Sequence, residues 1–179
     1  MNQTIVGSLC WIFANNSVLM LKRNKFPHQG LWAALGGKIE AGESPLECVI
    51  REVREESGLN IKYPDLRGIV SVYNQTTSQH WILFIYVASA HQGVLGKTTE
   101  GELAWMPIPI PANLLMAKTD RMYLNESINT RSGIFQAKII YDESSLFDVA
   151  LTYPSEKTRG EIIKIDKTAL DNRVNDKCP

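Results

Sequence analysis

One segment of the chain, residues 36–60, concentrates residues that could do chemistry. It reads GGKIEAGESPLECVIREVREESGLN and contains six glutamates. The whole chain carries 19 acidic and 19 basic residues, so this local excess of acid does not follow from its overall charge. Two interpretations are open. The glutamates could form the solvated face of a helix, or they could bind a divalent cation.

The residues that must position these glutamates predict a helix between Ser44 and Gly58. Ser44 is placed to cap the helix, Pro45 suits the first helical position, and Glu47 completes a capping box. Gly58 is placed to end the helix. The predicted buried stripe repeats at i, i+3, i+4 and i+7 and consists of Leu46, Val49, Ile50 and Val53.

The charges on this helix fit the two interpretations unequally. Glu47 and Arg51 form a favourable i,i+4 pair, which a solvated face explains. Glu52 and Glu56 are like charges at the same spacing, which costs roughly 0.2–0.5 kcal/mol, and Glu55 lies on the same face. A bound cation would remove this repulsion. Ligands that offer only oxygen favour Mg²⁺ or Mn²⁺ over zinc.

The spacing of the segment favours the metal site. Its key positions are Gly37, Glu43, Arg51, Glu52, Val53, Glu55, Glu56, Gly58 and Leu59. This pattern resembles the box of the Nudix hydrolases at every fixed position, and a chance match at a given start is on the order of 10⁻⁹. The similarity covers Gly37 to Leu59, and a weaker strand pattern extends it to about Leu124. Leu35 departs from the proline that usually precedes the double glycine.

The resemblance implies an α/β Nudix fold, with a mixed β-sheet sandwiched between α-helices. It also implies hydrolysis of a nucleoside diphosphate linked to another group, with Mg²⁺ or Mn²⁺ as the cofactor. The implied metal ligands are Glu52, Glu55, Glu56 and the backbone carbonyl of Gly37. Glu43 and Arg51 would shape the loop and the helix. The general base differs among family members, so its identity stays open among the glutamates of the box.

The resemblance also suggests site residues outside the box. MutT-type members place a glutamate before a tryptophan as a further metal ligand or base. Glu100 and Glu102 both qualify, and the glycine that follows favours Glu100. The implied catalytic residues are Glu52, Glu55, Glu56, Glu100 and Arg51. Each acid outside the box could equally be an exposed loop residue.

Four residues are candidates for binding the substrate. Arg23 could grip a phosphate with two parallel hydrogen bonds, and Lys38 could neutralise phosphate charge. Asn113 and Asp120 lie where MutT-type enzymes place purine-recognising residues, and the amide of Asn113 offers both a donor and an acceptor. A solvated strand end or a helix cap would explain the same residues without a ligand.

Length and composition place these residues in one domain. The chain has 179 residues and 44% hydrophobic residues, which suits a soluble globular domain. Its balanced charge favours neither a stable nucleic-acid complex nor an anionic membrane. Three cysteines without metal-ligand spacing favour reduced thiols and a cytoplasmic location. No segment reaches transmembrane length. The oligomeric state is not predicted.

The elements around the predicted helix alternate between strands and one further helix. Residues 4–23 read as a hairpin, residues 80–90 as a central strand and residues 113–128 as a second helix. A final hairpin with its turn at DESS completes a predicted Nudix domain over residues 1–153. Residues 154–179 read as a polar C-terminal extension with a composition typical of partial disorder.

The sequence therefore predicts a MutT-type pyrophosphohydrolase. Its expected substrate is 8-oxo-dGTP or a related purine nucleoside triphosphate, and its products are a nucleoside monophosphate and pyrophosphate. A second interpretation is a Nudix hydrolase of ADP-ribose, a dinucleoside polyphosphate or a capped RNA end. A third is a Nudix domain that binds nucleotides without hydrolysing them. The intact set of Glu52, Glu55 and Glu56 argues against this third interpretation.

Overall fold

A computed structural model describes residues 4–26, 28–88, 91–129, 133–142, 146–152 and 162–165. Its helices are α1 (Pro45–Ser57) and α2 (Lys118–Asn129). Its strands are β1 (Thr4–Ala14), β2 (Ser17–Arg23), β3 (Trp32–Ala33), β4 (Leu35–Lys38), β5 (Asn60–Ile61), β6 (Asp65–Asn74), β7 (Gln79–Ala88), β8 (His91–Gln92), β9 (Gly101–Pro107), β10 (Phe135–Tyr141), β11 (Leu146–Thr152) and β12 (Ile162–Ile165).

The strands form one large mixed sheet and one small sheet. The large sheet has the order β12-β11-β10-β6-β7-β1-β2-β3, with β4 paired to β1 and β9 paired to β2. The pairs β1–β7 and β6–β10 are parallel, and the other pairs of this sheet are antiparallel. Strands β5 and β8 form the small sheet. The predicted mixed sheet is confirmed.

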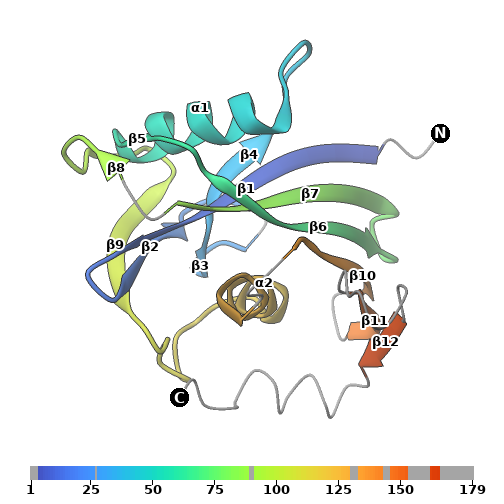
Figure 1. Cartoon of the computed structure of the whole chain (residues 1–179). Helices are drawn as coiled ribbons and strands as arrows, with labels where there is room; N and C mark the ends of the chain where they lie inside the picture. The colour runs from blue at the N-terminus through green and yellow to red at the C-terminus, as the bar shows by residue number, and fades with distance from the viewer. Residues whose placement is uncertain are drawn as a thin grey trace.

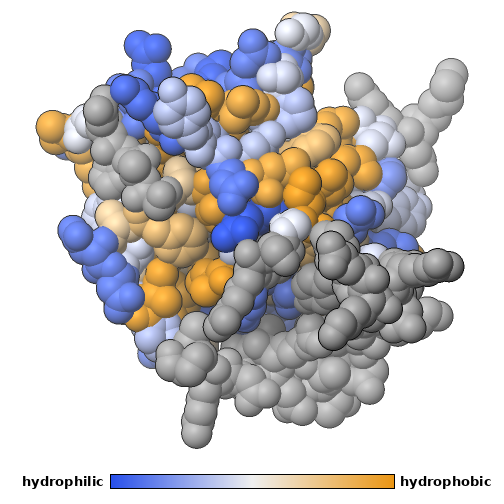
Figure 2. All heavy atoms as spheres, viewed as in Figure 1, coloured by the Kyte–Doolittle hydropathy of each residue, from blue (hydrophilic) through white to orange (hydrophobic). Residues whose placement is uncertain are grey.

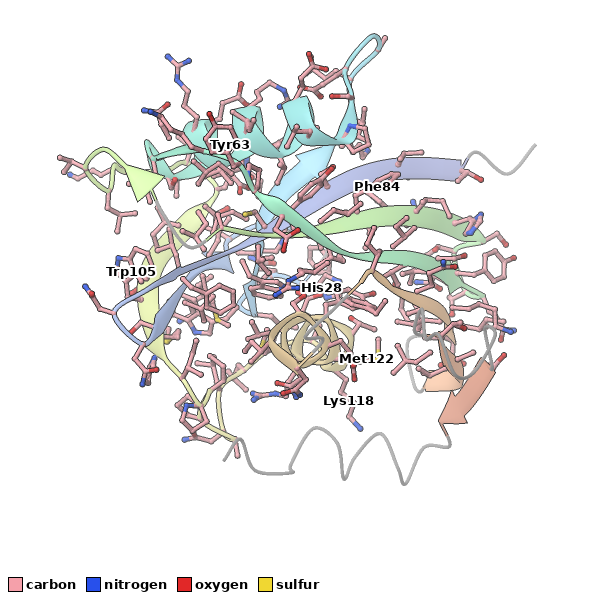
Figure 3. All side chains as sticks on the ribbon, viewed as in Figure 1. His28, Tyr63, Phe84, Trp105, Lys118 and Met122 are labelled. Atoms are coloured by element: carbon pink, nitrogen blue, oxygen red, sulfur yellow. The ribbon has the colours of Figure 1, made fainter. Side chains whose placement is uncertain are left out.

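The two helices lie on opposite faces of the large sheet (Figure 1). Side chains alternate along a strand, so β1 contributes to both cores. Cys10 and Ile12 pack in the core that contains Val49 of α1, whereas Trp11 packs in the core that contains Met122 of α2. Phe84 on the α1 side of the sheet and Met122 on α2 are labelled in Figure 3. The predicted sandwich of a sheet between helices is therefore confirmed.

Helix α1 has the predicted ends. The Ser44 side chain accepts a hydrogen bond from Glu47 N, the Glu47 carboxylate accepts one from Ser44 N at 2.8 Å, and Gly58 ends the helix in the left-handed conformation at φ 74°. The capping interactions need only residues close in sequence, which is why the sequence predicts them correctly.

The buried face of α1 differs from the predicted stripe. Val49 and Val53 are fully buried as expected, but Leu46 and Ile50 are 43% and 37% exposed. The additional buried residues of α1 are Cys48, Glu56 and Ser57. The helix packs mainly against β4 and β1, and Gly37 of β4 leaves room for the Glu52 side chain of α1. Figure 2 shows hydrophobic side chains at the surface beside α1, over the neighbouring strands.

Helix α2 begins later than predicted, at Lys118 rather than near residue 113. The preceding segment is held as a loop: Trp32 N donates to Leu115 O at 2.8 Å, and buried Arg121 donates to Pro111 O and Leu114 O at 3.2 and 3.0 Å. These contacts to the rest of the domain override the local preference for a helix. The prediction of a helix over residues 113–117 is therefore wrong.

The C-terminal part of the sheet contains the predicted final hairpin, because β10 and β11 pair antiparallel. Residues Ile162–Ile165, which read IIKI, form β12, which pairs with β11. Residues 153–161 and 166–179 lie outside the described residues, so the proposed boundary at residue 153 stays a prediction. No helix in the described ranges is long and apolar enough to cross a membrane.

Candidate active site

Arg51 of α1 is the centre of a network of charges at the surface of the helix. Its Nε and Nη2 donate to the two carboxylate oxygens of Glu43 at 2.8 and 2.9 Å. Its Nη1 donates to Glu52 at 2.8 Å and to Glu55 at 3.3 Å. Its Nη2 also donates to the carbonyl oxygen of Lys38 at 3.1 Å. Arg51 therefore joins the loop before α1, strand β4 and two of the predicted metal ligands.

The partners of Arg51 differ from the predicted i,i+4 pair with Glu47. The Glu47 carboxylate is occupied by the capping box at Ser44, whereas Glu43 binds the guanidinium through both oxygens. The hydrogen bonds from Arg51 lower the pKa of Glu43 to about 2. A two-point ion pair between a planar guanidinium and a carboxylate is stronger than a single helix-surface pair.

Glu52 and Glu56 face the double glycine of β4. Gly36 N donates to Glu56 Oε2 at 2.8 Å, and a Cβ at Gly37 would clash with the carboxylate of Glu52. Gly37 is therefore required by the approach of α1 to β4, because any side chain there would meet the Glu52 carboxylate. Gly36 is required by β1 instead, because its φ is 144° and a Cβ there would meet the backbone of Ser8 and Leu9.

Among the carboxylates of this site, the ionised form of Glu56 is strongly disfavoured. It is 6% exposed, and burial together with the nearby carboxylates of Glu52 and Glu100 raises its pKa to about 8, although the Gly36 N–H opposes this shift. Burial also raises the pKa of Glu52, partly offset by Arg51. A buried carboxylate beside other carboxylates gains stability from a proton or from a cation.

Glu100 lies at the beginning of β9, beside the end of β2. Its backbone oxygen accepts from Asn24 N at 3.0 Å, and its side chain pairs with Lys25 at 2.7 Å. Its charge contributes to the raised pKa of Glu56. Glu102 alternates with Leu103, which packs in the core beneath α1, so Glu102 points to the other face. Glu100 is therefore the stronger of the two candidates, because its charge acts on Glu56.

The donor set fits Mg²⁺ or Mn²⁺ in its chemistry, because every candidate ligand offers oxygen. Within the described part of the chain, no three acidic, histidine or cysteine side chains are arranged closely enough to hold a metal ion. Arg51 Nη1 binds Glu52 and Glu55, while Glu56 is turned to Gly36 N. The three carboxylates are thus held by contacts to Arg51 and to the backbone of β4.

The carbonyl group of Gly37 faces β1. Ile39 N donates to Val6 O at 3.0 Å, and this hydrogen bond makes the pair of Ser8 and Gly37 a hydrogen-bonded pair of the same antiparallel ladder. The Gly37 carbonyl oxygen has a second lone pair that the ladder does not use. The Cys48 sulfur of α1 lies 3.7 Å from this oxygen.

Arg23 connects the acidic site to α2. Its charge lowers the pKa of both Glu56 and Asp120, which burial raises. Its backbone holds the following loop, because Arg23 N donates to Leu31 O at 3.0 Å and Gly30 N donates to Arg23 O at 2.7 Å. The charge of Arg23 therefore acts on both Glu56 and Asp120.

Asp120 and Asn113 have different surroundings. Asp120 lies in the first turn of α2, is partly buried, and has a pKa that burial raises to about 7. Asn113 is exposed in the loop before α2. Of the two candidates for base recognition, Asp120 is the less exposed.

Lys38 is not brought to the carboxylates. Gly37 faces Glu52, so the next side chain of β4 points to the opposite face of the sheet. The Lys38 ammonium lies 5.7 Å from the centre of the Trp81 ring, whose side chain packs against the α2 core. Lys38 therefore lies on the side of the sheet opposite Glu52.

The sequence interpretation missed Cys48 and Lys25. Cys48 lies four residues before Glu52 on the same side of α1, and its sulfur contacts the backbone of β4. The i,i+4 spacing could have indicated this position. Lys25 pairs with Glu100 across 75 residues of sequence, and no local pattern predicts that contact.

Comparison with known proteins places this site in a family. The model of the NUDIX domain matches residues 3–124. An uncharacterised Nudix hydrolase of Bacillus subtilis is 36% identical over 115 residues, which are 62% of this chain and 71% of the relative. An ADP-ribose pyrophosphatase of Methanocaldococcus jannaschii is 35% identical over 81 residues, and the match spans about half of that relative (48%).

Solved structures agree with this assignment. A MutT protein from Bacillus halodurans superimposes with a TM-score of 0.71 and 31% identity, covering 82% of this chain and 97% of that chain. A MutT NUDIX hydrolase from Burkholderia pseudomallei gives a TM-score of 0.65 and 25% identity, covering 70% and 98%. Together with the box on α1, these matches show that the chain belongs to the Nudix hydrolase family and is of the MutT type.

Proposed function

We propose that this chain is a Mg²⁺- or Mn²⁺-dependent pyrophosphohydrolase of purine nucleoside triphosphates. The expected products are a nucleoside monophosphate and pyrophosphate, and 8-oxo-dGTP or a related purine triphosphate is the first substrate to test. The observation that carries the proposal is the burial of the Glu56 carboxylate against Gly36 N, where the charges of Glu52 and Glu100 help to raise its pKa. A domain that only binds nucleotides has no evident need for a carboxylate that is buried near other carboxylates.

The acidic residues would hold the metal through carboxylate oxygens. The proposed ligands are Glu52, Glu55, Glu56 and Glu100, with the Gly37 carbonyl as a candidate backbone ligand. Bound divalent cations neutralise phosphate charge and lower the pKa of a coordinated water. The chain itself supplies the orientation: Arg51 holds Glu52 and Glu55 from one side, and Gly36 N holds Glu56 from the other.

Proton transfer from the attacking water requires a carboxylate base. Glu52 and Glu56 both have raised pKa values, which makes them better proton acceptors than an unperturbed glutamate. The base is proposed to lie among the box glutamates. Arg23 is proposed to contact a phosphate group. Asp120 and Asn113 are proposed to hydrogen-bond the edge of the purine base, with Asp120 as the preferred candidate.

The relatives support a nucleotide substrate and leave a second candidate. A putative 8-oxo-dGTP diphosphatase of Bacillus subtilis is 28% identical over 116 residues, which are 73% of that protein. The archaeal ADP-ribose pyrophosphatase has higher identity over a shorter match. ADP-ribose is therefore the alternative substrate, since it contains the same diphosphate joined to an adenosine.

A hydrolysis screen tests the proposal. Purified protein is incubated with purine and pyrimidine triphosphates, 8-oxo-dGTP and ADP-ribose, each with Mg²⁺, with Mn²⁺ and with EDTA, and products are separated by ion-exchange chromatography. The proposal requires metal-dependent release of pyrophosphate from a purine triphosphate. Release of AMP from ADP-ribose would favour the alternative. No turnover of any nucleotide would favour a binding module.

A further inference from the structure

Cys48 is a buried thiol in the stripe of α1 that faces β4. It lies one turn before Glu52 and two turns before Glu55 and Glu56 on the same side of the helix. Its side chain is fully buried. Any movement of α1 relative to β4 would therefore change the contacts of the Cys48 side chain.

The Cys48 sulfur has polar contacts on both sides. It lies 3.5 Å from Lys38 O and 3.7 Å from Gly37 O, which are acceptors for its S–H group. Arg51 Nη2 lies 3.7 Å from the same sulfur and donates to it, while also donating to Lys38 O at 3.1 Å. The thiol and the guanidinium thus hold two consecutive carbonyl groups of β4.

These carbonyl groups belong to the strand that faces the acidic residues. Gly36 N, the donor to Glu56, and Gly37, against which the Glu52 carboxylate packs, are part of the same four-residue strand. A change in the distance between α1 and β4 would move this strand relative to both carboxylates.

We propose that Cys48 is a positioning residue for the acidic site: its thiol fixes the Gly37–Lys38 backbone against α1 and so sets the geometry in which Glu52 and Glu56 bind a cation. The inference rests on the proposed metal-dependent function. It assigns to Cys48 a structural role toward the metal site and no nucleophilic or redox step.

Cys10 provides a matched control. It is also a fully buried cysteine on the α1 side of the sheet, but it packs in an apolar cluster with Val49 and Leu35. Removal of its sulfur therefore tests the loss of apolar packing without the loss of the sulfur contacts to Gly37 O and Lys38 O. Cys48→Ser tests whether a hydroxyl donor replaces the thiol.

The experiment measures Mn²⁺ affinity of the full chain without substrate, by isothermal titration calorimetry. Thermal melting and steady-state kinetics accompany it for wild type, C48A, C48S and C10A. C48A is expected to weaken Mn²⁺ binding about fivefold, the equivalent of one net hydrogen bond of about 1 kcal/mol. C48S and C10A are expected to bind within about twofold of wild type, although C10A lowers the melting temperature. The kcat of C48A falls with little change in KM, because a displaced metal site affects turnover.

Several results would overturn the inference. Wild-type affinity in C48A, or an equal loss in C10A, would show that Cys48 only fills space. A loss in C48S as large as in C48A would exclude the hydrogen bonds as the cause, and C48S decides the question if C48A does not fold. Absence of Mn²⁺ binding by the wild type would overturn the proposed function together with the inference, whereas binding that is indifferent to Cys48 overturns the inference alone.

Discussion

Arg51 and Glu43 form a two-point ion pair, with Nε and Nη2 of the guanidinium 2.8 and 2.9 Å from the two carboxylate oxygens. The pair connects the loop before α1 to the second turn of the helix. It leaves Nη1 free to reach Glu52 and Glu55. The orientation of the proposed metal ligands therefore depends on Glu43, which lies eight residues before Arg51.

Replacement of Arg51 by lysine tests this geometry. Lysine keeps the charge but cannot bind Glu43 at two points and Glu52 at a third. We expect R51K to lower kcat at least tenfold, with a modest loss of stability. The matched control is R54K, since Arg54 is exposed on the same helix. Wild-type turnover in R51K would show that charge alone suffices.

Removal of ligand charge tests the proposed metal site. E55Q and E56Q keep the shape of each side chain and remove its negative charge. We expect each to lower kcat by orders of magnitude at saturating Mg²⁺, with the circular dichroism spectrum unchanged. E40Q, in the exposed loop before α1, is the control and should retain wild-type turnover. If both ligand variants turn over normally, the assignment of the site fails.

The raised pKa of Glu56 predicts how stability depends on pH in the metal-free protein. Its pKa is about 8 in the folded state against about 4.3 in an unfolded chain. The folded state then binds more protons between these values, so the free energy of unfolding decreases as pH rises from about 5 to 8. The slope from this group is at most about 1.4 kcal/mol per pH unit. Urea unfolding in EDTA should show this decrease, and E56Q should flatten it.

Added Mg²⁺ should oppose that loss of stability. A ligand that binds only the folded state stabilises it by mass action, and a cation replaces the proton that Glu56 otherwise prefers. We expect the rise in melting temperature to be larger at pH 8 than at pH 6, and smaller in E56Q than in wild type. NaCl at matched ionic strength controls for screening. An equal rise with NaCl would argue against a specific site.

The surroundings of Asp120 predict a role in base recognition that exposed Asn113 does not share. D120A is expected to raise KM for the preferred purine triphosphate about tenfold, in the range of 1–3 kcal/mol for an unmatched polar group, and to affect a pyrimidine triphosphate less. N113A is expected to change either KM less than about twofold. Equal effects of D120A on both substrates would indicate that Asp120 supports packing of α2.

Residues close in sequence determined the position and the ends of the helix that carries the acidic residues. The ends of α1 follow from Ser44, Glu47 and Gly58, because capping hydrogen bonds join residues three or four positions apart. The spacing of the box glutamates on one helix face and the resemblance to the Nudix family likewise needed no tertiary information. The mixed sheet between two helices confirmed the fold that this resemblance implied.

Tertiary structure decided which groups meet. The close approach of α1 to the glycines of β4 buried Cys48 and Glu56 and left Leu46 and Ile50 exposed, opposite to what helical periodicity alone predicted. Periodicity shows which residues share a face, but the neighbouring surface decides which face is buried.

The surroundings of each residue in the folded chain also decided which charged side chains pair with each other. Glu43 and Glu47 both lie within reach of Arg51, and the capping box at Ser44 left Glu43 for the guanidinium. Lys25 meets Glu100 through the register of β2 with β9, which joins segments far apart in sequence. The sequence by itself determined the acidic helix and its ends, whereas sheet register and the packing of α1 on β4 decided the environment of each carboxylate.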